Sequence, residues 1–316
     1  MRIGIVCSGG DAPGMNAALK KFVDVAHYLG HEPYFIYDGY EGMIDGKIKK
    51  AAHEDVSGIL HRGGTIIRSS RSKRFFEYKY RKQAYDNLKK EGIEHIIVLG
   101  GDGSFRGLNV LSGEFDISFT GIPATIDNDI SFSDYAIGVD TALNVIRDCV
   151  DNIRDTASSF RRAFVIETMG RECGYLAAVS AVANGAEICM IPEIKFDWEK
   201  NKNRLKEEFE NGRSYMIAIV AEGCDATQKM AKWIEESFDI EVRITVLGHV
   251  QRGGKPTVQE RLIAGEFVYE ALNNLDKKNM VVVRNGVNYD FVDIKTLTST
   301  PYKLDEKVLK LLNFLD

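Results

Sequence analysis

The stretch PATIDNDI, residues 123–130, places Thr125, Asp127 and Asp129 directly after the apolar run ISFTGI. Asp and Asn side chains bond to their own backbone and end strands as ordinary turn residues. The alternative is a site, in which one carboxylate accepts a proton and the other lies near a metal on the rigid end of a sheet. The octapeptide alone is compatible with both interpretations.

Polar segments follow six of the predicted strands. Besides PATIDND, five of them contain glycine: GGDAPGMN, GDGSFRG, MGRECG, the exit around Glu222 and Asp225, and HVQRGG. Any single glycine serves a turn, but in open α/β sheets ligands bind beyond the carboxyl ends of the strands. Gly9-Gly10 and the glycines of 100–103 remove side chains where a helix is about to start, so backbone N–H groups can face an anion. We therefore predict two phosphate-binding loops.

Charged residues in these segments suit a phosphorylated ligand. Asp102 could hold Mg²⁺, which takes one or two carboxylates plus substrate phosphates, or it could cap the following helix, with Ser104 as the competing cap. Planar guanidinium groups grip phosphate well, and several lie near strand ends: Arg71, Arg162, Arg171, Arg243 and Arg252. No G-x-G-x-x-G follows a strand, and GHVQRGGKP has Gly254 where a P-loop requires Lys, with no Ser or Thr directly after it.

The elements that must position these residues alternate along the chain. Apolar, β-branched runs predict strands at 2–8, 33–37, 94–100, 117–122, 162–168, 187–192, 215–223 and 242–248, and apolar residues at helical spacing predict helices at 15–30, 141–158 and 258–275. This alternation predicts an α/β fold with mainly parallel sheets. Because 316 residues exceed the usual limit of about 250–300 for one core, we expect two lobes, each a Rossmann-like three-layer sandwich.

Composition and net charge limit the classes of partner that we expect this chain to bind. With 44% hydrophobic and 28% charged residues and a formal charge of −5, the chain does not attract nucleic acid or an anionic membrane. No apolar run approaches the ~20 residues that span a bilayer, so a cytoplasmic protein is expected. The five cysteines form no C-x-x-C pair and the six histidines have no zinc-type spacing, which leaves oxygen-ligated metals such as Mg²⁺.

The motifs SGGDAPGMNAA, LGGDGS, ATIDND, ETMGRECG and VLGHVQRGG, in this order, resemble the ATP-dependent 6-phosphofructokinases of the bacterial type, from residue 3 to about residue 270. The resemblance implies phosphoryl transfer from MgATP to the 1-hydroxyl of fructose 6-phosphate, the committed step of glycolysis, in a cleft between two lobes. It implies a larger lobe (1–138 with 252–300) that binds MgATP and a smaller lobe (139–251 with 301–316) that binds the sugar phosphate. A pyrophosphate-dependent enzyme and a non-catalytic sugar-phosphate-binding regulator remain alternatives.

Residue roles follow from the resemblance. The implied catalytic residues are Asp127 as base, Thr125, Arg171 and Asp129, with Asp102 and Asp129 near the metal. The implied nucleotide-binding residues are Gly10, Tyr40, Arg71, Ser72, Gly101, Asp102, Gly103 and Ser104. The implied sugar-phosphate residues are Thr125, Asp127, Arg162, Met169, Gly170, Arg171, Glu222, Arg243, His249 and Arg252. Arg162 and Arg243 are expected to reach the 6-phosphate from a neighbouring subunit, which implies a homotetramer.

Some positions depart from the family pattern. Pyrophosphate-using relatives carry Asp at position 103 and Lys at position 124, so Gly103 and Ala124 favour ATP, whereas Ser72 and Arg106 predict an altered nucleotide choice. The family's effector site is matched in part, by Lys20, Arg154, Gly185, Glu187 and Arg213. Other positions lack the expected basic or imidazole groups: Asp24, His53, Asn211 and Tyr215. An acid repels phosphate, so we expect weak or absent effector control.

Overall fold

A computed structural model describes residues 1–315 of the chain, which fold into two compact units. Unit 1 comprises Met1–Thr141 and Arg252–Tyr302, and unit 2 comprises Ala142–Gln251 and the residues from Lys303 onward. None of the helices within residues 1–315 has the length and apolar character needed to cross a lipid bilayer.

Unit 1 is built on a seven-stranded sheet in the order β11-β10-β5-β4-β1-β2-β3. The central pairs are parallel, whereas β3 and β11 are antiparallel edge strands. The strands are β1 (Arg2–Cys7), β2 (Glu32–Ile36), β3 (Ile48–Lys50), β4 (His95–Gly100), β5 (Ser118–Pro123), β10 (Met280–Asn285) and β11 (Asn288–Asp293). In this order β1, β4 and β5 are neighbours, so the two glycine loops and the TIDND segment leave the same edge of the sheet.

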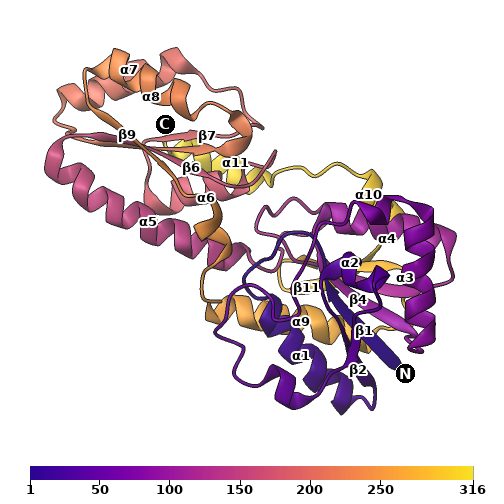
Figure 1. The fold of residues 1–316 in the computed structure, drawn as a ribbon. Coiled ribbons are helices and arrows are strands. Elements are labelled where there is room, and N and C mark those ends of the chain that lie inside the picture. The colour runs from indigo at the N-terminus through magenta and orange to yellow at the C-terminus, as the bar shows by residue number, and fades with distance from the viewer. Residues whose placement is uncertain (316) are drawn as a thin grey trace. The chain divides into compact units, whose positions relative to one another are not determined.

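Helices cover both faces of this sheet. Helices α1 (Met15–Tyr28) and α9 (Val258–Asn273) pack side by side on one face (Figure 1). The other face is covered by α2 (Gly39–Ile44), α3 (Tyr78–Lys90) and α4 (Asp102–Glu114), and α10 (Ile294–Ser299) packs against α4. Two short 3₁₀ turns, His53–Val56 and Arg74–Phe76, lie in the connections. Burial of apolar side chains between these layers is the main stabilising term.

Unit 2 has a four-stranded, fully parallel sheet in the order β7-β8-β6-β9. Its strands are β6 (Ala163–Thr168), β7 (Ile188–Met190), β8 (Met216–Ala221) and β9 (Val242–Val246). Helices α7 (Trp198–Glu210) and α8 (Thr227–Phe238) cover one face, and α5 (Val139–Phe160) and α6 (Tyr175–Asn184) cover the other (Figure 1). Helix α11 (Glu306–Leu312) packs on α6, and 3₁₀ turns occupy Glu222–Cys224, Gly248–Arg252 and Asn313–Leu315.

The predicted α/β class and all eight predicted strands are confirmed. Strands β3, β10 and β11 were not predicted. For the hairpin of β10 and β11 a signal was present in Gly286, because Asn285 pairs with Asn288 across a two-residue turn whose first residue, Gly286, adopts a φ of 61° that glycine readily takes. The C-terminal segment KLDEKVLKLLNFL, residues 303–315, forms helix α11 in its central part.

A buried acid anchors the start of α5, the helix that leads out of unit 1. Glu260 of α9 is fully buried, and its carboxylate accepts hydrogen bonds from the backbone N–H groups of Gly138 (2.7 Å) and Thr141 (3.0 Å) and from the Thr141 hydroxyl (3.1 Å). These donors stand at the N-terminus of α5, where an anion also matches the helix dipole. Burial nevertheless raises the pKa of Glu260 to about 7.

Candidate active site

The TIDND segment forms a buried turn at the end of β5. The backbone N–H of Asp127 donates to the Thr125 hydroxyl (3.2 Å), and Asn128 adopts a left-handed φ of 52° and donates its side-chain amide to the Asp134 carbonyl (3.0 Å). Turn chemistry therefore belongs to Thr125 and Asn128. The Asp127 side chain is 1% exposed, which is unusual for a carboxylate and needs a compensating partner.

Arg252 supplies that partner. Its guanidinium Nη2 lies 3.8 Å from Asp127 Oδ1, and its Nη1 donates to the Asp11 carbonyl (2.9 Å). The first glycine loop fits closely around this side chain, because a Cβ on Gly10 would lie 2.8 Å from Arg252 Nη1. One buried cation thus joins the TIDND turn to the first glycine loop, and Arg252 belongs to unit 1.

The second glycine loop forms the N-terminus of α4. The helix begins at Asp102 with Gly101 as its N-cap and no side-chain capping bond, so the capping alternative for Asp102 and Ser104 is wrong. The Asp102 carboxylate instead pairs with Arg106 Nε one turn later (2.7 Å). A Cβ on Gly103 would meet open space, so no protein atom fills this position.

Tyr40 lies inside the protein, beneath this loop. Its ring is buried and stacks on Phe75 with centroids 4.2 Å apart, and its hydroxyl donates to the Ser104 carbonyl (2.8 Å). This interior environment raises the pKa of Tyr40 through burial. Tyr40 therefore holds the start of α4 in place. Ser72 is also engaged, because its hydroxyl donates to Glu41, whereas Arg71 is exposed.

Oxygen donors for Mg²⁺ are present, although residues 1–315 contain no group of three or more His, Cys, Asp or Glu side chains that could hold a metal by themselves. Asp102 is 37% exposed beside the open space at Gly103, and Asp129 is partly exposed. Mg²⁺ keeps several waters and needs only one or two carboxylates when phosphates complete its shell. The residues thus fit a metal that arrives with a phosphorylated ligand.

In unit 2 the segment after β6 forms a strained turn. Gly170 has a φ of 138° and Arg171 a φ of 53°, and a Cβ on Gly170 would lie 2.3 Å from the Cys173 carbonyl oxygen. Glu222, at the end of β8, accepts hydrogen bonds from the N–H groups of Gly170 (3.1 Å) and Arg171 (2.8 Å). Backbone conformations of this rare kind cluster at functional sites. They persist because neighbouring contacts, here those of Glu222, offset their cost.

Gln251 supports the same turn. Its amide oxygen accepts from the Met169 N–H (3.2 Å), its amide nitrogen donates to the Gly248 carbonyl (2.9 Å), and its side chain is fully buried. The sequence analysis missed this role. Gln is a residue type that is mostly exposed, so the sequence gives no sign of this role. Only the packing of the 248–252 turn lets Gln251 connect Met169 with Gly248.

Arg162 and Arg243 meet at a residue that the sequence analysis did not single out. Arg162 Nε lies 2.5 Å from Glu241 Oε2, and Arg243 pairs with Glu241 Oε1. Arg162 also lies over the Phe160 ring, 4.7 Å from its centroid. His249 is exposed. The structure therefore brings the two arginines together around one carboxylate.

The unit 1 residues at the family's effector positions pair with each other. Lys20 Nζ lies 2.7 Å from Asp24 Oδ1, and His53 Nδ1 lies 3.2 Å from the same oxygen. Asp24 thus pairs with both Lys20 and His53, at a position where the family pattern predicts a basic or imidazole group. An incoming phosphate would meet this carboxylate.

The unit 2 effector positions are also satisfied internally. Arg154 donates to the Tyr215 hydroxyl (3.2 Å) and to the Gly185 carbonyl (3.3 Å), and Arg213 Nη1 lies 2.6 Å from Glu187 Oε1. Burial lowers and the two neighbouring carboxylates raise the pKa of Arg213, with a net upward shift. In this structure both arginines make their contacts within unit 2 and stabilise its fold.

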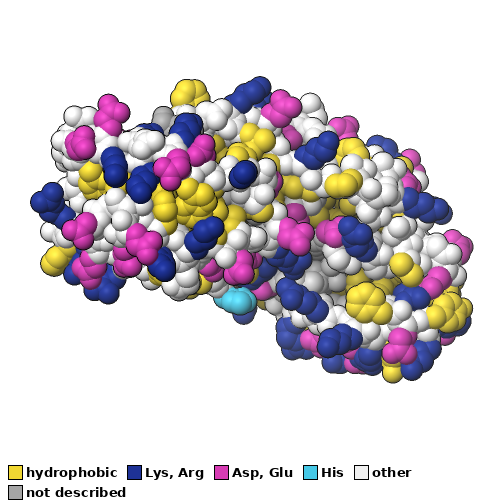
Figure 2. Space-filling view, turned by 90° about the horizontal axis from the view of Figure 1, so that it is seen from above, with side chains coloured by type: hydrophobic (Ala, Val, Ile, Leu, Met, Phe, Trp, Pro, Cys, Tyr) yellow, Lys and Arg dark blue, Asp and Glu magenta, His cyan; other side chains and the backbone are white. Residues whose placement is uncertain are grey.

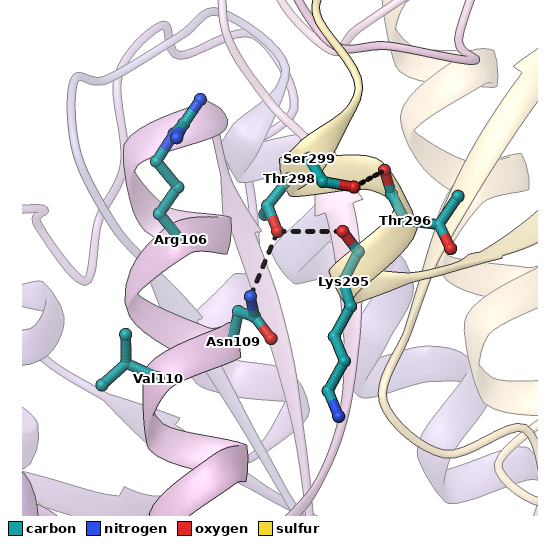
Figure 3. A pocket seen from close by; sticks show the side chains of 7 residues that line it. All are labelled: Arg106, Asn109, Val110, Lys295, Thr296, Thr298 and Ser299. Atoms are coloured by element: carbon teal, nitrogen blue, oxygen red, sulfur yellow. Dashed lines mark hydrogen bonds between the residues drawn. The ribbon is translucent and has the colours of Figure 1, made fainter.

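A separate hollow of about 600 Å³ lies between α4 and α10 (Figure 3). Its hydroxyls are used within the protein, because Thr298 accepts from Asn109 (3.2 Å) and Ser299 donates to the Thr296 carbonyl (3.1 Å). The cations Arg106 and Lys295 extend in opposite directions, as Figure 3 shows. The polar side chains that line this hollow do not point toward one common position where a ligand could bind.

Comparisons with known proteins identify the family of this chain. The sequence model of the phosphofructokinase family matches residues 2–275. The ATP-dependent 6-phosphofructokinase of Wolinella succinogenes is 54% identical and covers 98% of both chains, and that of a Sulfurovum species is 55% identical over 98% of this chain and 95% of its own. The chain therefore belongs to the phosphofructokinase family.

Solved structures agree with this assignment. Phosphofructokinase from Saccharomyces cerevisiae matches with a TM-score of 0.88 and 32% identity, over 94% of this chain and 45% of the yeast chain. A pyrophosphate-dependent phosphofructokinase from Nitrosospira multiformis matches with a TM-score of 0.84 at 16% identity, over 99% of this chain and 91% of its own, which shows the shared fold alone.

Proposed function

We propose that this chain is an ATP-dependent 6-phosphofructokinase, which transfers the terminal phosphoryl group of ATP to the 1-hydroxyl of fructose 6-phosphate. The products are fructose 1,6-bisphosphate and ADP. The observation that carries the proposal is the buried Asp127 carboxylate, paired with Arg252 at the end of β5 and joined through it to a glycine loop. The names of the relatives favour ATP over pyrophosphate as the donor.

In the proposed reaction Asp127 is the general base that accepts the proton of the sugar hydroxyl. Phosphoryl transfer needs little covalent help, so an aligned hydroxyl and a proton acceptor suffice on the acceptor side. The Arg252 guanidinium, with Nη2 3.8 Å from Asp127 Oδ1, offsets the negative charge of this buried carboxylate. Thr125 holds the Asp127 backbone in the turn. General base catalysis of this kind contributes typically 10²- to 10⁴-fold.

Electrostatic groups match the charge on the transferred phosphoryl oxygens. The candidates for this role are the Gly10 backbone amide and the exposed Arg71 in unit 1 and, in unit 2, Arg171 on the turn that Glu222 holds. Asp102 and Asp129 would hold Mg²⁺, which supplies charge neutralisation to the phosphates when bound. Gly103 leaves room for the inner phosphates of the nucleotide.

The sugar phosphate is assigned to unit 2 and the nucleotide to unit 1. Met169, Gly170 and Glu222 would line the sugar, and Arg162, Arg243 and His249 would bind its 6-phosphate, in a homotetramer in which a neighbouring chain contributes the two arginines. Acidic and basic side chains are intermixed on the face shown in Figure 2, which does not suggest a nucleic-acid partner. We propose a cytoplasmic enzyme that acts in glycolysis.

A coupled assay of fructose 1,6-bisphosphate formation tests the proposal. Wild type, Asp127→Asn and the control Asp225→Asn are compared with MgATP and with magnesium pyrophosphate. Asp225 is an exposed acid with a φ of 46°, a conformation that Asn also adopts readily. We expect ATP-dependent turnover that falls at least about 10²-fold in Asp127→Asn and stays near wild type in the control. Turnover with pyrophosphate and not with ATP would refute ATP as the phosphoryl donor. No turnover with either donor would favour a non-catalytic sugar-phosphate-binding regulator.

A further inference from the structure

We propose that Glu241 sets the affinity of this protein for the phosphate of its sugar substrate, as a resident counter-ion that the phosphate must compete with. The inference rests on the proposed function, in which Arg162 and Arg243 bind that phosphate. One carboxylate contacts both guanidinium groups, at 2.5 Å from Arg162 Nε and through its other oxygen to Arg243. Of the phosphate-binding cations, these two are thus already partly neutralised.

The sheet register builds this cluster. Strands β6 and β9 are parallel with Ala163 opposite Val242, and the Ala163 N–H donates to the Glu241 carbonyl (3.0 Å). Arg162 and Glu241 therefore stand opposite each other, one residue before the paired strands. Glu241 and Arg243 are two residues apart, so their side chains leave the same face of the strand. The register of β6 against β9 therefore places Glu241 beside both arginines.

The cluster remains accessible to a ligand. The side chains of Arg162, Glu241 and Arg243 are 29%, 44% and 56% exposed. Two guanidinium groups and one carboxylate carry a net charge of +1, whereas a phosphomonoester brings a charge of about −1.5 to −2 and three acceptor oxygens. The guanidinium fork suits phosphate as well as carboxylate, so both anions seek the same N–H donors.

The contacts of Arg162 decide the sign of the effect. Its guanidinium also lies over the Phe160 ring, 4.7 Å from the centroid, which is a second contact besides the one with Glu241. The Arg243 backbone is fixed by its pairing with Phe164 across the sheet. Glu241→Gln keeps an amide oxygen as acceptor for the two guanidinium groups and removes the negative charge that repels phosphate, so phosphate should bind more tightly. If Glu241 instead mainly oriented the arginines, its removal would weaken binding.

The test compares wild type, Glu241→Gln, Arg162→Ala and the control Glu236→Gln in the full chain. Glu236 is an exposed acid on α8 that pairs with Lys232, at 3.6 Å. The measurements are the KM and kcat for fructose 6-phosphate and direct calorimetric binding of that sugar. We expect Glu241→Gln to lower KM and Kd by about 3- to 10-fold, on the scale of one close charge repulsion, with the change falling on KM and not on kcat.

Each other outcome overturns a defined part of the reasoning. A higher or unchanged KM in Glu241→Gln, with Arg162→Ala weakening binding at least about 10-fold, would refute the counter-ion role and leave the phosphate site standing. Unchanged binding in Arg162→Ala would refute the arginine pair as the phosphate site. Absence of fructose 6-phosphate binding by wild type would refute the proposed function together with this inference. A similar gain in Glu236→Gln would show a general effect of net charge.

Discussion

Replacement of Glu260 by Gln tests which force governs the buried anchor of α5. The carboxylate accepts three hydrogen bonds, which favour its charged form, while its complete burial favours the neutral form. Burial wins in this balance, because it raises the pKa of Glu260 from the ordinary value of 4.5 to about 7. Gln cannot ionise, but its NH2 group cannot accept a hydrogen bond, so the substitution removes the charge together with one acceptor. The pH dependence of the difference from wild type therefore reports the cost of the charge.

The magnitude follows from linkage between protonation and folding. Between pH 4.5 and pH 7 the folded protein binds more protons at this site than the unfolded chain, so the free energy of unfolding falls as pH rises through this window. The full loss amounts to about 3 kcal/mol, since one pKa unit corresponds to 1.36 kcal/mol. For a unit the size of unit 1, about 3 kcal/mol corresponds to a shift of about 6–12 °C in thermal midpoint. This loss should be absent in Glu260→Gln.

Differential scanning calorimetry from pH 5 to pH 8.5 measures the effect, with Glu270→Gln on the same helix as control. Groups other than Glu260 titrate in both proteins, so the difference between their midpoints reports this carboxylate. We expect Glu260→Gln and wild type to unfold within a few degrees of each other at pH 5, and Glu260→Gln to be the more stable protein at pH 8.5. If it is the less stable protein at pH 8.5, the three hydrogen bonds outweigh desolvation and the reasoning fails.

Two further predictions concern the donor and the effector. Gly103→Asp should fold normally, because its side chain enters open space, but should lower kcat/KM for ATP at least about 10-fold by repelling the inner phosphates; an unchanged value would contradict the assignment of this loop. Sub-millimolar ADP should leave the fructose 6-phosphate saturation curve unchanged, because Lys20 and Arg213 already pair with Asp24 and Glu187. Strong sigmoidal kinetics that ADP relieves would count against this prediction.

The sequence by itself determined the fold class and the family. Strand and helix periodicity is local, so the eight apolar runs could be identified without any contact information. Glycines and polar residues at strand ends marked the segments from which Asp127, Gly10 and Asp102 come, because the carboxyl ends of parallel strands are where such folds bind ligands.

Tertiary structure alone decided the partners of these residues. Arg252 is 125 residues from Asp127 in the sequence, and only packing brings its guanidinium to 3.8 Å. The Glu241 cluster depends on the register of β6 against β9, which is a long-range pairing that local periodicity does not encode. Glu260 carries no motif at all, and its role arises because α9 packs where α5 begins. Local patterns specify which elements form, whereas the environment of a charge depends on neighbours distant in the chain.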